Sequence, residues 1–553
     1  MKCSIGLDFG TLSVRCLLLD IDSGNELALS EFSYPHGVMD ERLPSGVKLG
    51  IDFALQDPAD YLEGLETTIK DVLRQTGVPP GEIIGIGVDF TACTILPIDR
   101  DGVPLCSFEQ FKDNPQAYVK LWKHHAAQEQ ASEMVKTALE RGEDFLKRYG
   151  GSISSEWLFP KVLETYDLAR DVYDATDRFI EACDWIVFNL TGIETRNSNA
   201  AGFKAFWDKD TGSYPGKDYF EQVRPGFAGD LFMKVKDNIH QTGTRAGGLT
   251  KAWADKLGLP LDLPVAVGVM DAHAGFPSLG ITEPGYMMMI IGTSTCHEIM
   301  VQETGYTEIP GMCGVVRDGL LPGFNCYEMG QSGVGDSFQW FAGNATPAAY
   351  LQEAQARGIS LHKLLNEKAA LLKPGQNGLV ALDWMNGNRS ILNNANLSGV
   401  IAGLTLQTKP EEIYRALIEA TAFGTRKIIE TFKNNGLAIK GITACGGISE
   451  KSPLTMQIYA DVTGMPIRLA ASQQAAARGA AIYGAVAANQ AEGLASIFKM
   501  VQRLGKTKDL DFKPDYQNQK IYDQVYAHYN LLHDFFGLRQ NELMKQLKDL
   551  KKL

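Results

Sequence analysis

The chain has 553 residues, and its 44% hydrophobic and 22% charged residues are typical of a globular protein with an ample core rather than a disordered one. The formal net charge of −13 argues against nucleic acid or an anionic membrane as the main partner, because proteins that bind either normally present a basic face. The nine cysteines are dispersed and contain no Cys-x-x-Cys pair. These features predict a protein of the reducing cytoplasm, without a disulfide framework, a signal peptide or a transmembrane span.

The first motif is a predicted β-hairpin near the N-terminus. An apolar strand ends in Asp8, the chain turns through Gly10, Thr11 and Ser13, and a second strand follows. Backbone N–H groups near Gly10 and the two hydroxyl groups can bind phosphate oxygens, and Asp8 can hold a hydrated cation. The same residues also fit an ordinary tight turn with a solvated aspartate, so the hairpin alone leaves both interpretations open.

The following stretch contains helix, strand and small-residue loop in that order. The predicted elements are a loop over 33–57, a helix over 58–75, a strand over 83–88, mostly helical structure over 114–174 including 118–125, and a strand over 264–269. The strand over 83–88 leads to a loop of small residues, Thr91–Thr94, and the strand over 264–269 ends in Asp271.

The same pattern then begins again. A second strand-turn-strand over 286–301 has a tip of small and hydroxyl residues, Gly292-Thr293-Ser294. It is followed by a helix over 411–433, a strand over 441–445 with a glycine loop, a strand over 466–470 and a helix over 474–488. Two copies of one module predict two similar α/β lobes, and the helical tail after residue 499 is expected to serve packing.

Two hairpin tips that face one nucleotide would bind its phosphate groups from opposite sides. Only the first hairpin has an acid before its glycine, since Ile290 stands where the first has Asp8, which suits a single Mg²⁺ ion. Gly446-Gly447, at the end of a strand in the second copy, can let an adenine ring lie against the backbone.

Other nucleotide and metal motifs are absent from the sequence. There is no G-x-x-x-x-G-K-[ST], and Gly330–Gly335 has neither the spacing nor the preceding strand of a dinucleotide fingerprint. There is no H-E-x-x-H, and His124-His125 is interpreted as a solvated helix face rather than a metal site.

Four features together resemble the superfamily of sugar kinases, actin and heat-shock chaperone ATPases: Asp8-Phe9-Gly10-Thr11, Gly292-Thr293-Ser294, Gly446-Gly447 and the strand that ends in Asp271. Within it, the chain is similar to the FGGY carbohydrate kinases over nearly its whole length. Residues 399–404 and 412–419 resemble the C-terminal signature of that family. The N-terminal signature around 156–161 is matched approximately, with Glu164 where a tryptophan is often seen. Residues 114–125 and 201–204 look most like the members that phosphorylate ribulose.

The resemblance implies an α/β fold with two actin-like (ribonuclease H-like) lobes and a catalytic cleft between them. We expect a sugar-binding lobe over 1–270, a nucleotide-binding lobe over 271–495 and a helical tail over 496–553. The implied reaction is ATP- and Mg²⁺-dependent phosphorylation of ribulose at its terminal hydroxyl, as in L-arabinose catabolism, by a cytoplasmic homodimer. Alternatives are a kinase for xylulose, ribitol or a related polyol, an actin-like ATPase, and a sugar-binding regulator without activity.

The resemblance also implies the site residues. The expected sugar-binding residues are Ala92, Thr94, Lys204, Asp271 and Glu328. The expected nucleotide-binding residues are Gly10, Thr11, Ser13, Gly292, Thr293, Ser294, Gly446, Gly447 and Lys451. Asp8 is expected to hold the metal and Asp271 to act as the catalytic base.

Each of three residues also has a purely structural interpretation. Asp271 could cap the helix that follows it, Lys204 could be a surface residue, and Glu328 could be a capping or salt-bridge partner. The turn that carries an Arg-Glu pair in glycerol kinase reads Thr91-Ala92-Cys93-Thr94 here. The smaller side chains leave room for a longer polyol, such as a five-carbon ketose.

Overall fold

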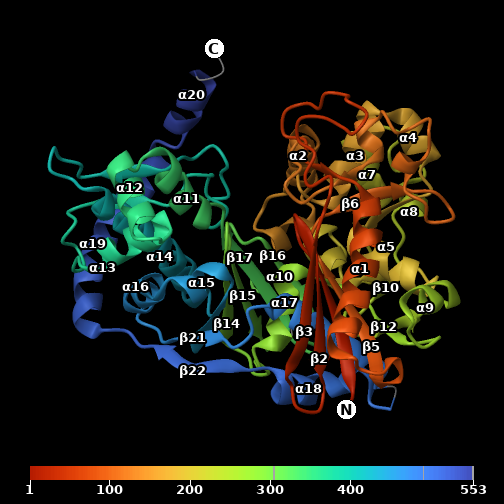
Figure 1. Cartoon of the computed structure of the whole chain (residues 1–553). Coiled ribbons are helices and arrows are strands. Elements are labelled where there is room, and N and C mark those ends of the chain that lie inside the picture. Colours follow the sequence, from red (N-terminus) through yellow and green to blue (C-terminus); the bar gives the residue numbers. More distant parts are fainter. Residues whose placement is uncertain (303–304, 490, 551–553) are drawn as a thin grey trace. The chain divides into compact units, whose positions relative to one another are not determined.

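The structure, a computed structural model, describes residues 1–302, 305–489 and 491–550 (Figure 1). The chain forms two compact units. The first unit contains residues 1–282, 315–326 and 474–506, and the second contains residues 283–314, 327–473 and 507–553. Among the described residues, no helix is long and apolar enough to cross a membrane.

The first unit is built on a mixed sheet whose strands run in the order β11-β12-β5-β1-β2-β3, with β13 paired to β5. These strands are β1 (Cys3–Phe9), β2 (Ser13–Asp20), β3 (Glu26–Ser33), β5 (Ile83–Phe90), β11 (Arg245–Gly248), β12 (Pro264–Ala266) and β13 (Val269–Met270). β1 and β2 are antiparallel, which confirms the predicted hairpin, and β1 runs parallel to β5.

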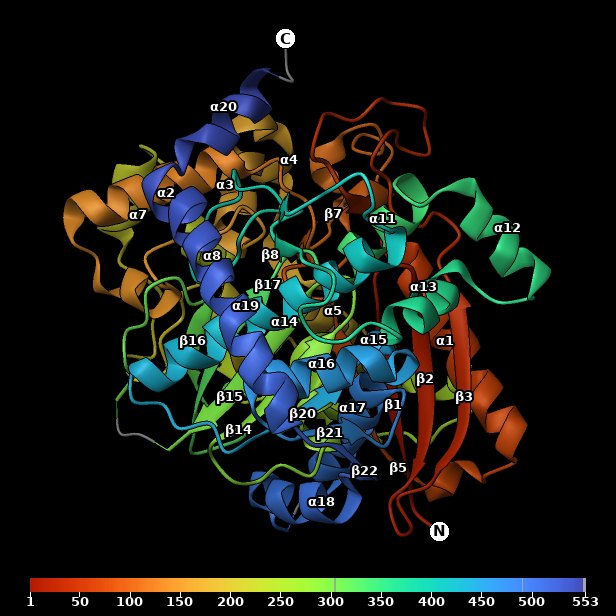
Figure 2. The same ribbon diagram turned by 90° about the vertical axis from the view of Figure 1, so that its left-hand side faces the viewer.

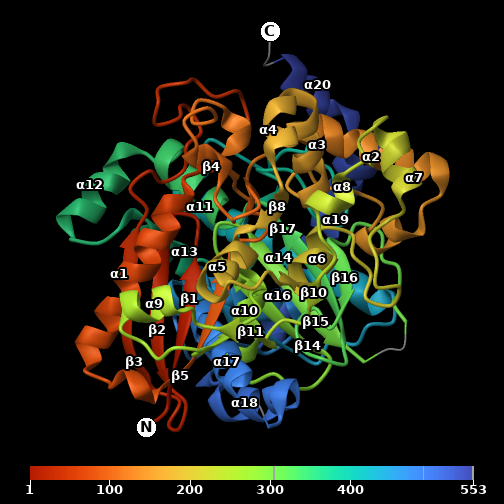
Figure 3. The ribbon, with the colours of Figure 1, turned by 90° about the vertical axis from the view of Figure 1, so that its right-hand side faces the viewer.

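Helices cover both faces of this sheet (Figures 1 and 3). On one face, Leu7 of β1 packs in a buried cluster with residues of α1 (Pro58–Thr76) and α5 (Ala182–Thr191). On the other face lie α17 (Ala475–Ala488) and α10 (Asp271–Ser278). A Cβ atom added to Gly87 would lie 1.8 Å from the carbonyl oxygen of Ala480, so α17 rests directly on the backbone of β5.

The rest of the first unit consists of insertions. They include a four-stranded sheet, β4 (Leu55–Gln56), β7 (Val119–Lys120), β6 (Ile95–Ile98) and β8 (Arg178–Glu181), and a short pair, β9 (Arg196–Asn197) and β10 (Ile239–His240). Their helices are α2 (Gln128–Arg141), α3 (Leu158–Leu168), α4 (Arg170–Ala175), α6 (Ser198–Lys204), α7 (Lys217–Val223), α8 (Leu231–Lys234) and α9 (Lys251–Leu257); α18 (Ile497–Leu504) also belongs to this unit.

The prediction of a helix over 118–125 was wrong. Residues 119–120 form β7, which pairs with β4 and β6, and the first α-helix of this region begins at Gln128. The physical reason is that polar side chains of this stretch, Lys120 and His124, turn inward to Glu164 of α3, which an exposed helix would not allow.

The second unit repeats the central arrangement of the first. The strands of its sheet run in the order β16-β17-β15-β14-β20-β21-β22. They are β14 (Tyr286–Ile291), β15 (Thr295–Val301), β17 (Asn325–Gln331), β20 (Gly441–Cys445), β21 (Ile467–Ala470) and β22 (Thr507–Phe512); β16 (Gly314–Arg317) precedes β17 along the chain. β14 is antiparallel to β15 and parallel to β20, as β1 is to β2 and β5, so the predicted internal duplication is confirmed.

In the second unit, α15 and α16 contact strands of this sheet, and α19 runs beside α16 and α14 (Figure 2). The helices of this unit are α11 (Gly335–Asn344), α12 (Ala348–Ala356), α13 (Leu361–Ala370), α14 (Pro410–Asn434), α15 (Gly447–Lys451), α16 (Pro453–Thr463), α19 (Tyr516–Asp534) and α20 (Glu542–Leu550), with a hairpin of β18 (Val380–Leu382) and β19 (Val400–Ala402). Tyr522 of α19 donates to Glu419 of α14, so the helical tail packs as expected.

The compact units differ from the expected division at residues 270 and 495. Residues 271–282 and 474–506 belong to the first unit, and the expected tail is divided between the two units near residue 506. The reason is the small-residue surface of α17, whose alanine and glycine residues fit closely against glycines of β1 and β5. The helix over 474–488 was expected to belong to the second lobe, but as α17 it covers the first sheet.

Candidate active site

Three carboxyl groups meet at the carboxyl ends of neighbouring strands in the first unit. Asp8 of β1 and Asp89 of β5 are register partners, and β13, which also pairs with Asp89, leads directly to Asp271. Side chains alternate along a strand, and Gly6 and Gly87 face α17. Asp8 and Asp89 lie two residues farther on and therefore point to the same face, where α10 begins with Asp271.

Because these carboxyl groups are buried and close together, the cluster is stabilised by a nearby positive charge or by protonation of one carboxyl group. Arg15 Nη1 lies 3.3 Å from Asp8 Oδ2. Burial raises the pKa of Asp8, against the opposing effect of Arg15. Asp89 is fully buried, and its pKa is raised well above the usual range by burial first and then by the charges of Asp8 and Asp271. The last effect also places Asp271 close to the pair.

Asp271 is the first residue of α10, and its own carboxylate accepts the backbone N–H of Ala272 at 2.7 Å. Met270, not Asp271, occupies the capping position, so the interpretation as a helix cap is wrong in its simple form. The turn is held by Asn199 of α6, whose Oδ1 accepts the Met270 N–H at 3.1 Å and whose Nδ2 lies 2.6 Å from His273 Nδ1.

The tip of the first hairpin, Gly10–Ser13, is fixed by hydrogen bonds. The Gly10 N–H donates to the Ser13 carbonyl at 2.9 Å. Thr11 accepts from Gln56 Nε2 at its carbonyl oxygen (2.8 Å) and from Trp122 Nε1 at its hydroxyl (3.1 Å). The Ser13 hydroxyl donates to Glu31 at 2.6 Å, so a phosphate group would have to compete for it.

The loop Thr91–Thr94, here called the sugar loop, lies next to this tip. The Thr91 N–H donates to the Phe9 carbonyl at 3.0 Å, and the Ala182 N–H donates to the Thr94 carbonyl at 2.7 Å. The two threonine hydroxyls are 2.7 Å apart. Ala92 is half-buried and Thr94 is buried.

Lys204, the last residue of α6, is buried rather than a surface residue. Its charge opposes the rise in the pKa of Cys93 that burial causes, which places its ammonium group near the sugar loop. The structure places Lys204, the sugar loop and Asp271 all in the first unit, although Asp271 was expected to begin the second lobe.

The second unit contains the other expected nucleotide residues. The second tip, Gly292–Ser294, accepts backbone hydrogen bonds from the start of α11: Val334 to Thr293 (2.9 Å) and Gly335 to Gly292 (3.0 Å). Gly446 has φ of 94°, and a Cβ there would lie 2.6 Å from the Ile291 carbonyl oxygen. Only glycine fits this position, which brings Gly447 beside the tip, while Lys451 ends α15 and is exposed.

Glu328 of β17 also lies in the second unit and is buried. It forms an ion pair with Arg389, whose Nε donates to Cys313 Sγ at 3.1 Å. The structure thus contains the salt bridge that sequence reasoning gave as the alternative to a sugar contact.

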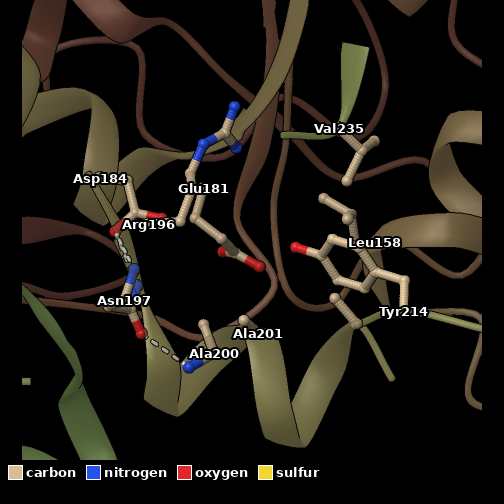
Figure 4. A pocket seen from close by; sticks show the side chains of 10 residues that line it. Leu158, Glu181, Asp184, Arg196, Asn197, Ala200, Ala201, Tyr214 and Val235 are labelled. Atoms are coloured by element: carbon tan, nitrogen blue, oxygen red, sulfur yellow. Dashed lines mark hydrogen bonds between the residues drawn. The ribbon is translucent and has the colours of Figure 1, made fainter. Parts of the chain in front are cut away.

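A small cavity with polar and apolar lining residues lies in the first unit (Figure 4). Its lining includes Glu181, Asp184, Arg196, Asn197 and Tyr214. The Glu181 carboxyl and the Tyr214 hydroxyl point toward one another across it. Glu181 pairs with Ile95 directly after the loop, and burial raises the pKa of Glu181 to about 8.

The interpretation of His124 as part of a solvated helix face was wrong. His124 is fully buried, its Nε2 lies 2.9 Å from Glu164, and burial lowers its pKa to about 4. It is not a metal ligand either: across the described ranges, no group of three or more His, Cys, Asp or Glu side chains is placed to hold a metal.

Sequence reasoning missed three residues of the first unit: Asp89, Arg15 and Asn199. Two of them had a usable signal. Counting outward from the hairpin turn pairs Asp8 with Arg15, and Asp89 follows a predicted parallel strand that ends as the first one does. Asn199 had no such signal, because its contact with Met270 joins residues 71 positions apart.

Proteins of known structure share this two-unit α/β fold. Two solved structures illustrate the fold: a xylulose kinase from Rhodospirillum rubrum (TM-score 0.78, 22% identity, 97% of this chain and 99% of that one) and a gluconate kinase from Lactobacillus acidophilus (0.75, 18%, 97% and 98%). Residues 287–488 match the C-terminal domain of the FGGY family of carbohydrate kinases.

Curated relatives extend this match to the whole chain. The ribulokinase of Bacillus licheniformis is 52% identical over 544 residues, which cover 98% of each chain. The ribulokinase of Staphylococcus aureus is 39% identical over 551 residues, or 100% of this chain and 99% of the relative. The chain therefore belongs to the FGGY family of carbohydrate kinases and is itself a sugar kinase, with a sugar and ATP as its substrates.

Proposed function

We propose that this protein transfers the terminal phosphoryl group of ATP to ribulose, giving ADP and ribulose 5-phosphate. The observation that carries the proposal is the identity of about half of all residues, over the full length, with several proteins named ribulokinase. Similarity to the xylulose kinases of known structure is much lower, at 16 to 22% identity, and supports only the fold. A role in L-arabinose catabolism in the cytoplasm, by a homodimer, is part of the same proposal.

Asp271 is proposed as the catalytic base. Phosphoryl transfer depends mainly on positioning and on charge stabilisation, so the base need only orient the attacking hydroxyl and accept its proton as the new O–P bond forms. The position of Asp271 supports this role, because a strand end fixes its backbone and Asn199 holds the preceding peptide N–H.

We propose that the sugar is bound by Ala92, Thr94 and Lys204 around Asp271, with Glu328 from the second unit. The small side chains of the sugar loop leave space for a ketopentose, and the buried ammonium group of Lys204 can donate to its hydroxyl groups. To contact the sugar, the Glu328 carboxylate would have to accept a hydrogen bond from a sugar hydroxyl while it remains paired with Arg389.

We propose that the nucleotide is bound by Gly10, Thr11 and Ser13 of the first unit and by Gly292–Ser294, Gly446, Gly447 and Lys451 of the second. Mg²⁺ typically combines one or two protein carboxylates with phosphate oxygens and water. The chemistry of the donor set fits this ion, since Asp8 is a buried carboxylate beside a second one, Asp89. When bound, Mg²⁺ would neutralise phosphate charge.

The role of Asp8 is tested by Asp8→Ala. We expect the Mg²⁺ concentration for half-maximal activity to rise by at least tenfold, and Mn²⁺ binding in the presence of ADP, followed by electron paramagnetic resonance, to weaken, with ribulose affinity nearly unchanged. An equal loss of ribulose and metal affinity would indicate a structural role instead.

The reaction itself is tested by identifying its product. The protein is incubated with ATP, Mg²⁺ and ribulose, and the product is examined by ³¹P and ¹³C nuclear magnetic resonance. We expect one phosphate monoester, on carbon 5. A phosphate on another carbon, or ATP hydrolysis without a sugar phosphate, would contradict the proposal, and the latter would favour an actin-like ATPase.

A further inference from the structure

Lys161 of α3 is a buried lysine whose hydrogen bonds all go to backbone carbonyl groups. Its ammonium group donates to Cys93 at 2.6 Å, to Leu121 at 2.8 Å and, more weakly, to Lys120 at 3.4 Å. An ammonium group has three protons, so these three carbonyls use its full donor capacity. Burial lowers the pKa of Lys161 to about 8, so the group stays mostly protonated at pH 7.

The carbonyls belong to two segments that border the proposed active site. Cys93 lies in the sugar loop between Ala92 and Thr94, and its backbone is in the left-handed region with φ of 55°. A residue other than glycine adopts this conformation only when its surroundings hold it there. Lys161 supplies such a restraint at the Cys93 carbonyl.

Leu121 directly precedes Trp122, whose indole N–H donates to the Thr11 hydroxyl of the first tip. Lys161 therefore connects the sugar loop, through Leu121 and Trp122, to the tip that is proposed to bind phosphate. Ala92 and Trp122 also pack, half-buried, against the same apolar cluster.

A second set of buried contacts holds α3 in place beneath these segments. Glu164, one helical turn after Lys161, accepts from Lys120 Nζ at 2.7 Å and from Gln116 Nε2 at 3.1 Å. Lys120 Nζ also donates to the Lys161 carbonyl at 2.8 Å. Removing one partner of a buried ion pair leaves an uncompensated charge, so this pair restrains α3 against the segment that carries Lys120. Glu164 stands where the family signature often has tryptophan, and this network accounts for the difference.

We propose that Lys161 is a positioning residue for the sugar: through the Cys93 and Leu121 carbonyls, its ammonium group sets the place of the sugar loop relative to the first tip. The inference rests on the proposed function, because it takes Ala92 and Thr94 as sugar contacts. Lys161 acts through the loop and does not touch the reacting atoms.

The test is Lys161→Met, which keeps most of the length of the unbranched side chain and removes its donors. Loss of the donors leaves buried carbonyls unsatisfied, so the loop will shift to find new partners. We expect the KM for ribulose to rise by about tenfold or more and the KM for ATP to change by less than about threefold.

The matched control is Lys234→Met in the same unit. Lys234 is also buried and also donates to a backbone carbonyl, that of Thr176, but it contacts neither the sugar loop nor the first tip. We expect a similar loss of thermal stability with an unchanged KM for ribulose. Equal effects of the two variants on KM would overturn the proposal.

A second variant, Glu164→Gln, covers the case in which Lys161→Met does not fold. It preserves shape and leaves Lys161 in place, but it removes the charge that holds Lys120. We expect a smaller rise in the ribulose KM, again without an equal rise for ATP. A folded Glu164→Gln or Lys161→Met protein with both KM values unchanged, or raised equally, would also overturn the proposal.

Failure of the proposed function is recognised separately. If the wild-type protein accepts another sugar in place of ribulose, the same variant-to-wild-type ratio is measured with that sugar. The identity of the accepted sugar then tests the proposed function, and the variant-to-wild-type ratio of KM tests the role of Lys161.

Discussion

Among single residues, Asp271 has two roles. Its carboxylate accepts the Ala272 N–H, and we propose that it also accepts the proton of the sugar hydroxyl. Replacing it with asparagine keeps size and hydrogen bonding but removes the base. We expect Asp271→Asn to lower kcat by at least ~10²-fold, because general-base catalysis contributes at least about that much to the rate. The affinities for ribulose and ATP should be retained. Steady-state kinetics and calorimetric titration of ribulose check both parts. Turnover near the wild-type value would assign the base to another residue.

Glu181 provides a pH-dependent prediction at the same scale. Its pKa in the folded protein is about 8, above its usual 4.5, because burial disfavours the charged form. The folded state therefore holds the proton more tightly, and the stability linked to this group is complete below about pH 4.5 and is lost as pH rises through 8.

The comparison with Glu181→Gln isolates this effect. Between pH 5 and pH 8.5, we expect the free energy of unfolding of the wild type to fall relative to the variant by about 2–4 kcal/mol, at about 1.4 kcal/mol per pKa unit. Urea denaturation at several pH values measures it. Parallel pH profiles for the two proteins would show that Glu181 is ionised at neutral pH in the folded state.

At the scale of elements, α17 packs directly against the backbone of the first sheet, next to the site. A Cβ on Gly87 would lie 1.8 Å from the Ala480 carbonyl oxygen, and Asp89 of the candidate site follows two residues later in β5. We expect Gly87→Ala to destabilise the protein by about 1–3 kcal/mol or more, because a buried backbone cannot move away freely.

The control for this prediction is Gly81→Ala. No atom lies within 4 Å of a Cβ at Gly81, so its unfolding midpoint in urea should stay close to that of the wild type. If Gly87→Ala were as stable as Gly81→Ala, the close contact between α17 and β5 would be disproved.

Elements with strong local patterns were predictable from the sequence. α1 begins at Pro58 and α14 spans Pro410–Asn434, each within about one residue of its predicted range, because their apolar positions recur with helical spacing. Residues 118–125 were not predictable in this way. Their spacing looked helical, but Lys120 and His124 are buried by a partner 40 or more positions away, which local periodicity does not reveal.

At the scale of the whole molecule, the duplication was predictable and the route of the chain was not. The two hairpins and their parallel neighbours repeat in the sequence, so two α/β units followed directly. The return of residues 474–506 to the first unit depends on shape complementarity between α17 and β5, nearly 400 positions apart, and no local signal marks it. The motifs of each unit are local in the sequence and were found. Asn199 and Lys161 contact carbonyl or N–H groups that are distant in the sequence, so no role was predicted for them.

The central claim is that the whole molecule is a kinase for ribulose. Its most direct test is the steady-state kcat/KM with ATP and Mg²⁺ across ribulose, xylulose, ribitol, arabinitol and glycerol, followed through ADP release. We predict the highest value for ribulose. A value at least tenfold higher for xylulose or glycerol would contradict the account.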